Sequence, residues 1–157
     1  MIVYLDTSSL VKLYKNEAGT LEVDRAVLAA DSVITSALTF VEAHSAFSLS
    51  KRLAVARQGS LVARADPSLD VEAAYAQIVA AFEGDWRARD YFTITVSRRV
   101  IARAARLSQA HPLRALDAIH LASALLLSES QSGQVLLSSF DPRQTAAASI
   151  EGLAMAH

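Results

Sequence analysis

With 157 residues, 52% of them apolar, and a formal net charge of −1, the chain can bury the core of one domain over residues 1–157, and disorder is not expected. The absence of cysteine excludes disulfides, thiolate chemistry and cysteine-based zinc sites. The longest charge-free apolar stretch, residues 118–128, is too short to cross a bilayer, and no basic leader precedes an apolar segment. We therefore expect a cytoplasmic protein with no membrane partner.

Along the chain, short strand-like runs alternate with helical patterns. The strand-like runs are residues 2–5, 32–35, 91–96, 135–139 and 152–156, and the helical patterns cover residues 8–14, 21–30, 36–57, 69–82, 100–107 and the stretch from 117 onward. The strand runs are apolar throughout, as in parallel sheets covered on both faces. The order predicts a three-layer α/β/α sandwich with a short central parallel sheet, plus a helical excursion at about residues 50–90.

The last helical pattern starts with a single carboxylate. Asp117 stands at the head of an apolar run in which no further charge appears until Glu129, so we predict a helix that is buried almost all round. A carboxylate in such surroundings must be protonated, paired or bound to a cation, because an isolated buried ion costs several kcal/mol. Asp117 is therefore the first candidate for a functional side chain.

Three further acids are predicted to reach the same edge of the sheet. Asp6 ends the first strand run, Asp141 follows the run at 135–139 within a common aspartate–proline turn pattern, and Glu42 lies about two turns into the helix after the second strand. Ligands gather at the carboxyl ends of parallel strands. A divalent cation relieves the repulsion among clustered carboxylates, and oxygen-only ligands favour Mg²⁺ or Mn²⁺. Taken singly, each acid is also explained as a helix cap, a turn residue or a solvated charge.

Four stretches of the chain, residues 4–14, 36–42, 113–122 and 137–141, carry a family resemblance. In their residues, order and rough spacing they resemble PIN-domain ribonucleases of the VapC type, which are toxins of type II toxin–antitoxin systems. The resemblance implies catalytic and metal-binding roles for Asp6, Glu42, Asp117 and Asp141. It also implies a Mg²⁺- or Mn²⁺-dependent endoribonuclease acting on RNA, held inactive by a small antitoxin and commonly forming a homodimer. Two departures are a longer interval between Glu42 and Asp117 and a less helical pattern after Asp141.

For the mechanism, we expect Asp6 and Asp117 to bind the cation most directly, and Glu42 to position or deprotonate the attacking water. Asp141 or Glu42 would complete the metal shell. One alternative is a PIN-like module that binds RNA without cutting it, and the presence of all four acids weighs against it. A second alternative is a receiver-like or phosphotransferase domain with Asp6 as phosphoacceptor. It usually needs a lysine late in the chain, and none follows Lys51.

Several other polar and aromatic residues have two interpretations each. Seven arginines between Arg87 and Arg114, against one acid, either bind RNA phosphates or form a solvated helix face. His120 either orients a carboxylate or is a satisfied core histidine. Trp86 and Tyr91 either stack on bases or pack in the core. The hydroxyls at 7, 8 and 139 can hydrogen-bond metal ligands or bound water, and capping explains those at 7 and 8 equally well.

The segment from about residue 53 to 82 has more apolar side chains than two helices can bury against each other. They are Leu53, Val55, Leu61, Val62, Leu69, Val71, Tyr75, Ile78, Val79 and Phe82. An exposed apolar patch of this kind indicates a partner interface, so we expect either a homodimer contact or an antitoxin-binding groove. The other interpretation is a segment folded back onto the sheet.

Overall fold

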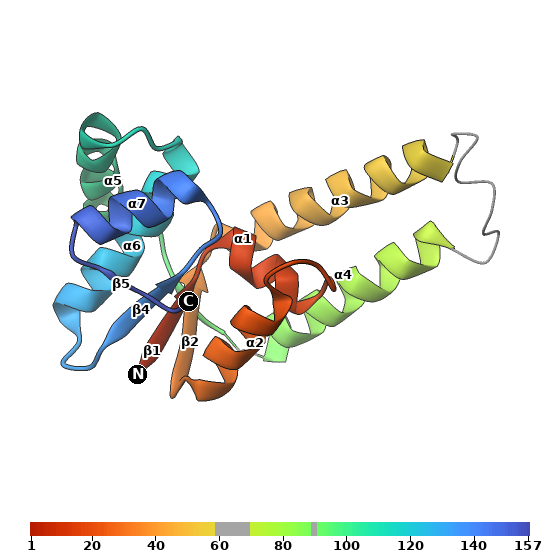
Figure 1. The fold of residues 1–157 in the computed structure, drawn as a ribbon, viewed down its shortest axis with the longest axis horizontal. Helices are drawn as coiled ribbons and strands as arrows, with labels where there is room; N and C mark the ends of the chain where they lie inside the picture. Colours follow the sequence, from red (N-terminus) through yellow and green to blue (C-terminus); the bar gives the residue numbers. More distant parts are fainter. Residues whose placement is uncertain (59–69, 89–90) are drawn as a thin grey trace.

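The computed structural model describes residues 1–58, 70–88 and 91–157, and its centre is a parallel five-stranded sheet (Figure 1). The strand order is β3-β2-β1-β4-β5, and every neighbouring pair is parallel. The strands are β1 (Ile2–Leu5), β2 (Ser32–Ser36), β3 (Phe92–Ile94), β4 (Val135–Ser138) and β5 (Ala154–Met155). The predicted α/β fold is confirmed. The two edge strands are shorter than predicted, because each pairs with a neighbour on one side only.

Seven α-helices of the described chain cover the sheet. They are α1 (Thr7–Leu10), which continues into a 3-10 turn at Val11–Leu13, α2 (Thr20–Ala29), α3 (Thr39–Gln58), α4 (Val71–Ala88), α5 (Arg98–Ala110), α6 (Ala115–Ser130) and α7 (Pro142–Ile150). Alternate residues of β1 separate the two layers. Val3 and Leu5 pack in one core with α1 to α4, and Tyr4 packs in the other with α5 to α7.

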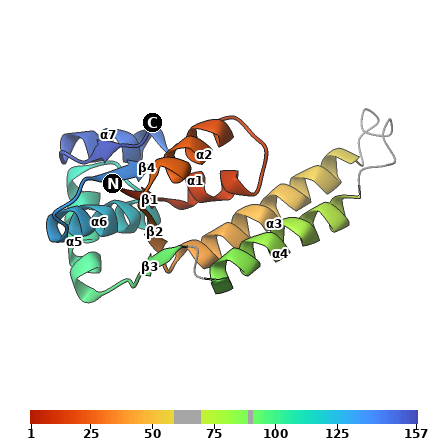
Figure 2. The ribbon, with the colours of Figure 1, turned by 90° about the horizontal axis from the view of Figure 1, so that it is seen from below.

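The predicted excursion is a long helical hairpin, in which α3 and α4 lie side by side and project from the sheet (Figures 1 and 2). It begins earlier than predicted, because α3 is continuous from Thr39. The helix itself starts at Thr39 and not at residue 36 as predicted, so Glu42 lies in the first turn of α3 and not two turns in. Helix α4 begins at Val71 and extends beyond the predicted end to Ala88. The predictions that fall on residues 59–69 and 89–90, including Leu61, Val62, Leu69 and Arg89, lie outside the described residues.

Helix α6 has the burial that its sequence predicts. Its residues from Ala118 to Leu125 are almost all buried, and they pack in one core with Val100 and Leu107 of α5. None of the helices in the described ranges combines the length and apolarity that a membrane crossing requires.

The helix α7 was not predicted. The Asp141–Pro142 pair, interpreted as a turn, is instead a helix start. The Asp141 carboxylate accepts hydrogen bonds from the backbone N–H groups of Arg143 (2.8 Å) and Gln144 (3.1 Å). Pro142 occupies the first helical position, where a missing N–H group costs nothing. The prediction was wrong because an aspartate–proline pair is equally compatible with a turn and with a capped helix.

One glycine, Gly19, packs closely against an aromatic ring from the far end of the sequence. Gly19 precedes α2 with φ of +92°, and a Cβ atom there would lie 2.5 Å from Cε1 and Cζ of Phe140, just after β4. The Phe140 ring also carries the Lys12 ammonium 4.5 Å from its centroid. The backbone conformation and the close ring contact both require glycine.

We therefore expect Gly19→Ala to lower the free energy of unfolding by about 1–3 kcal/mol, because left-handed backbone strain adds to the overlap with Phe140. The matched control is Gly84→Ala in α4, where no atom lies within 4 Å of the added Cβ. There the better helix former should gain about 0.5–1 kcal/mol. Urea denaturation measures both variants. Wild-type stability of Gly19→Ala would contradict the close packing.

Candidate active site

Asp6 is a buried carboxylate held entirely by neutral donors. It follows β1 directly, caps α1, and is 5% exposed. Its Oδ1 accepts hydrogen bonds from the Ser9 N–H (3.0 Å) and the Ser8 hydroxyl (2.7 Å), and its Oδ2 accepts one from the Ser139 hydroxyl (2.8 Å). Burial raises the pKa of Asp6, and the nearby His120 and these donors oppose the shift without cancelling it. The predicted role of Ser139 as a partner of this acid agrees with the contact.

Glu42 is held through one of its two oxygens. Its Oε2 accepts hydrogen bonds from the Thr7 hydroxyl and from His120 Nε2, both at 2.7 Å. Burial would raise the pKa of Glu42, but the contacts with His120 and Thr7 outweigh it and the pKa is lowered. His120 is a buried histidine whose Nδ1 lies 3.1 Å from the Tyr4 hydroxyl and whose Nε2 also lies 3.4 Å from the Thr7 hydroxyl. It therefore contacts a carboxylate of another helix, Glu42 of α3.

Asp117 and Asp141 lie close enough for their charges to interact. Asp117 lies in the first turn of α6, and its Oδ2 is buried without a hydrogen-bond partner among the described residues. Burial and then the charge of Asp141 raise the pKa of Asp117, with Arg114 and Arg143 acting in the opposite direction. Burial also tends to raise the pKa of Asp141, but the backbone N–H groups of Gln144 and Arg143 lower it overall.

Gln144 connects the acids, and the sequence analysis missed it. It is fully buried; its Nε2 donates to the backbone carbonyl of Asp117 (3.0 Å), and its Oε1 contacts the Ser139 hydroxyl. Ser139 in turn contacts Asp6 and accepts the Asp141 N–H (3.2 Å). The available signal was the spacing of Asp141 and Gln144, which matches a cap followed three residues later by glutamine.

The four predicted acids thus occupy one edge of the sheet, supplied by the end of β1 and by the starts of α3, α6 and α7. In the parts of the chain that the structure describes, no three His, Cys, Asp or Glu side chains are grouped so that they could hold a metal as they stand. The donor chemistry nevertheless fits a hard cation. Asp117 offers a buried oxygen with no partner, and the anionic forms of Asp6 and Asp117 are disfavoured without a positive charge.

Three of the seven arginines of the cluster form ion pairs within the protein. Arg99 and Arg103 lie 3.6 and 3.7 Å from Glu129 carboxylate oxygens, and Arg103 lies 3.4 Å from Glu151. Arg87 pairs with Glu83 one turn away on α4. These contacts favour the helix-face interpretation for the three arginines. Arg114 differs, because its charge acts on Asp117.

The aromatic residues near the hairpin pack in the core. Trp86 lies 5.2 Å from Phe40, 5.6 Å from Phe82 and 6.4 Å from Tyr91, measured between ring centroids. This arrangement agrees with core packing, the second of the two interpretations from sequence.

Comparisons with known proteins connect this geometry to a family. The PIN domain matches residues 3–150. Ribonuclease VapC45 and ribonuclease VapC49, from two strains of Mycobacterium tuberculosis, are each 30% identical over 128 residues, which is 82% of this chain and 78% of theirs. A toxin–antitoxin complex from Klebsiella pneumoniae superposes with a TM-score of 0.62, and FitAcB from Neisseria gonorrhoeae with 0.54. Both are 18% identical to this chain and match 99% of it. The match covers 98% of the chain from Klebsiella pneumoniae and 96% of the chain from Neisseria gonorrhoeae.

The raised pKa of Asp117 predicts a stability effect. Because its folded pKa lies above the unfolded value, stability that is present at low pH is lost as the pH rises through the folded pKa. At neutral pH without metal, Asp117→Asn should therefore melt a few degrees above wild type, and the difference should shrink as the pH falls toward the ordinary aspartate value. Added Mg²⁺ should raise the Tm of wild type more than that of the variant.

The matched control for this measurement is Asp24→Asn on α2, which makes the same chemical change away from the edge and should follow wild type throughout. Calorimetry with EDTA and then with Mg²⁺ provides both comparisons. An unchanged or lower Tm of metal-free Asp117→Asn would contradict the strain assigned to this carboxylate.

Proposed function

The chain belongs to the PIN domain family, and from this premise we propose that it is a Mg²⁺- or Mn²⁺-dependent endoribonuclease, the toxin of a VapBC-type toxin–antitoxin pair. The observation that carries the proposal is the gathering of Asp6, Glu42, Asp117 and Asp141 at one sheet edge, with a buried oxygen of Asp117 left without a partner. The chain's relation to ribonucleases of the VapC type, at 30% identity, supports RNA as the substrate.

The surroundings of each residue suggest a different role for it in the proposed reaction. Asp6 and Asp117 would hold the cation, with Asp141 or Glu42 completing its shell, and the bound cation would polarise the scissile phosphate and lower the pKa of a coordinated water. Glu42 has a lowered pKa and is anionic at neutral pH, so it can accept the proton of the attacking water. Arg114 and Arg143, which act on Asp117, place positive charge where a phosphate would approach.

The phosphoacceptor alternative has little support in the sequence. Such domains usually need a lysine late in the chain, and none follows Lys51. The RNA-binding module without cleavage is tested by the activity of the wild-type protein itself.

Asp6→Asn should reduce Mg²⁺-dependent cleavage of RNA by at least about 100-fold, since charge stabilisation by a bound cation supplies several kcal/mol. The amide retains nearly the same volume, so the folded protein should persist. Asp24→Asn is again the matched control and should retain full activity. Cleavage is followed on a labelled single-stranded RNA with Mg²⁺, Mn²⁺ or EDTA. Undiminished turnover by Asp6→Asn would refute the proposed role, and an inactive wild type would favour the non-cleaving module.

The proposed antitoxin partner has a candidate surface on the α3–α4 hairpin. On the outward side of α3, the side chains of Val41, Leu49 and Leu53 are exposed at a helical spacing of four or eight residues. Among the segment predicted to face a partner, Leu53 and Val55 are exposed, whereas Val71 and Phe82 are buried. The apolar surface for a partner therefore comes mainly from α3.

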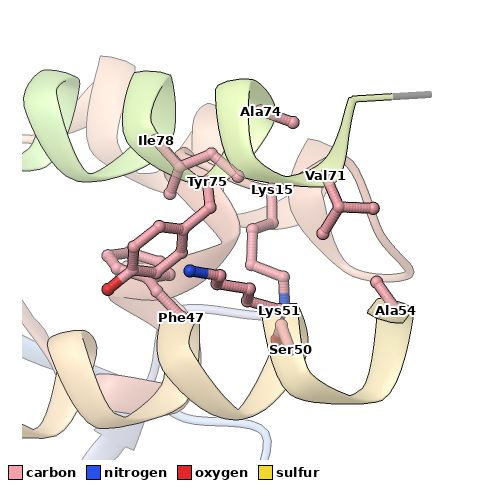
Figure 3. A pocket seen from close by; sticks show the side chains of 9 residues that line it. All are labelled: Lys15, Phe47, Ser50, Lys51, Ala54, Val71, Ala74, Tyr75 and Ile78. Carbon is pink, nitrogen blue, oxygen red and sulfur yellow. Dashed lines mark hydrogen bonds between the residues drawn. The ribbon is translucent and has the colours of Figure 1, made fainter. Parts of the chain in front are cut away.

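A pocket of about 160 Å³ lies between the two helices of the hairpin (Figure 3). Phe47, Tyr75 and Ile78 are among the apolar side chains that line it, and Lys15 and Lys51 add positive charge. The Lys51 ammonium lies 4.7 Å from the Tyr75 ring centroid. Because Lys15 and Lys51 are already paired with Glu17 (3.1 Å) and Glu72 (2.6 Å), the pocket suits an apolar side chain, which we assign to the antitoxin.

We expect Leu53→Glu to abolish co-purification with a co-expressed cognate antitoxin, because a charge at the half-exposed Leu53 disrupts an apolar contact without unfolding the helix. The matched control, Leu28→Glu, changes an 86% exposed leucine on α2 and should leave the complex intact. Light scattering of the chain alone identifies a homodimer through the same face. A complex that survives Leu53→Glu would place the antitoxin elsewhere.

A further inference from the structure

A buried chain of hydrogen bonds leads from the sheet core to the candidate active site. Tyr4 of β1 is fully buried, and its hydroxyl lies 3.1 Å from His120 Nδ1. His120 of α6 is 2% exposed, and its Nε2 lies 2.7 Å from Glu42 Oε2. Thr7 of α1 donates its hydroxyl proton to the same oxygen, also at 2.7 Å. The chain thus joins four elements that meet at the acidic edge.

The hydrogen-bond partners indicate which atom carries each proton in this series of hydrogen bonds. A tyrosine hydroxyl is protonated at neutral pH and can donate its proton to Nδ1. His120 then carries its own proton on Nε2 and donates it to the Glu42 carboxylate. The opposite tautomer would place a nitrogen lone pair against a carboxylate oxygen and leave two facing acceptors, which is unfavourable in a buried site.

The two donors occupy only one oxygen of Glu42. Both the Thr7 and His120 contacts are made to Oε2, and the described residues offer Oε1 no hydrogen bond. The carboxylate can therefore not rotate without losing both bonds. Its free oxygen is held in a single direction, which is the preorganisation that an acid acting on a water or a metal ion needs.

We propose that His120, itself oriented by Tyr4, is a positioning residue that clamps Oε2 of Glu42 and leaves Oε1 as the oxygen that acts. This inference deepens the proposed function and rests on it for its kinetic consequence. It assigns no contact between His120 and the substrate. The histidine acts through Glu42 only.

The test compares three variants of the full chain. His120→Leu fills the buried space but removes the donor to Glu42, and His120→Gln keeps an N–H group near the position of Nε2. Leu121→Ala, at the next, fully buried position of α6, is the control for lost packing alone. All three are measured at a temperature at which circular dichroism shows each variant folded.

We expect His120→Leu to weaken Mn²⁺ binding, followed by electron paramagnetic resonance, by about 10-fold or more, as removal of groups that orient metal ligands does. Its kcat for RNA cleavage should fall by a similar factor with KM unchanged. His120→Gln should recover most of both losses, and Leu121→Ala should show neither. Equal behaviour of His120→Leu and Leu121→Ala would overturn the proposal.

A double-mutant cycle tests whether His120 acts through Glu42. In a Glu42→Gln background, His120→Leu should cause no further loss of Mn²⁺ affinity, because the group through which it acts is already changed. Fully additive losses would contradict the inference. They would indicate that His120 acts independently of Glu42.

A spectroscopic measurement separates this inference from the proposed function. Long-range ¹H–¹⁵N correlation spectra of the metal-free protein should show His120 protonated on Nε2, and Tyr4→Phe should shift the imidazole nitrogen signals. A tautomer protonated on Nδ1 alone would refute the clamp even in an active ribonuclease. The expected tautomer in a protein that neither binds Mn²⁺ nor cuts RNA would leave the clamp standing and remove the proposed function.

Discussion

The placement of four carboxylates at the N-terminal ends of helices is the constraint on which the rest of the site depends. Asp6 and Asp141 cap α1 and α7, and Glu42 and Asp117 lie in the first turns of α3 and α6. Unpaired backbone N–H groups and the positive end of the helix dipole favour negative charge at such positions. They partly offset the cost of burying acids beside one another.

The sheet register places these helix starts together. β1 is central, with Leu5 paired to Thr35 of β2 and Ser138 of β4, so the residues that follow each strand emerge at one edge. Val3 and Leu5 face one core and Tyr4 faces the other. A slip by one residue would exchange these faces and remove Tyr4 from His120. Core packing and the position of Glu42 are therefore maintained by the same residues of β1.

The electrostatics divide the acids into two kinds. Glu42 and Asp141 have donors that lower their pKa values, whereas burial keeps the pKa values of Asp6 and Asp117 raised. The first kind is stable as an anion in the protein alone, as a base or a positioned ligand requires. The second kind carries a strain that a cation can relieve. In each acid, the direction of the pKa shift follows from two opposing effects: hydrogen-bond donors lower the pKa, and loss of solvent raises it.

The sequence by itself determined the parallel α/β fold, the strand cores and the acids at the strand ends, because these follow from local apolar runs and from the edge at which parallel strands end. It also predicted that the helix of Asp117 is buried. Only the tertiary structure decided that Arg99 and Arg103 pair with acids of other elements, and that His120 contacts Glu42 of α3. The contact between Gln144 and the Asp117 backbone is of the same kind. Such partners are separated by tens of residues, and a single chain without its packing contains no local pattern that pairs them.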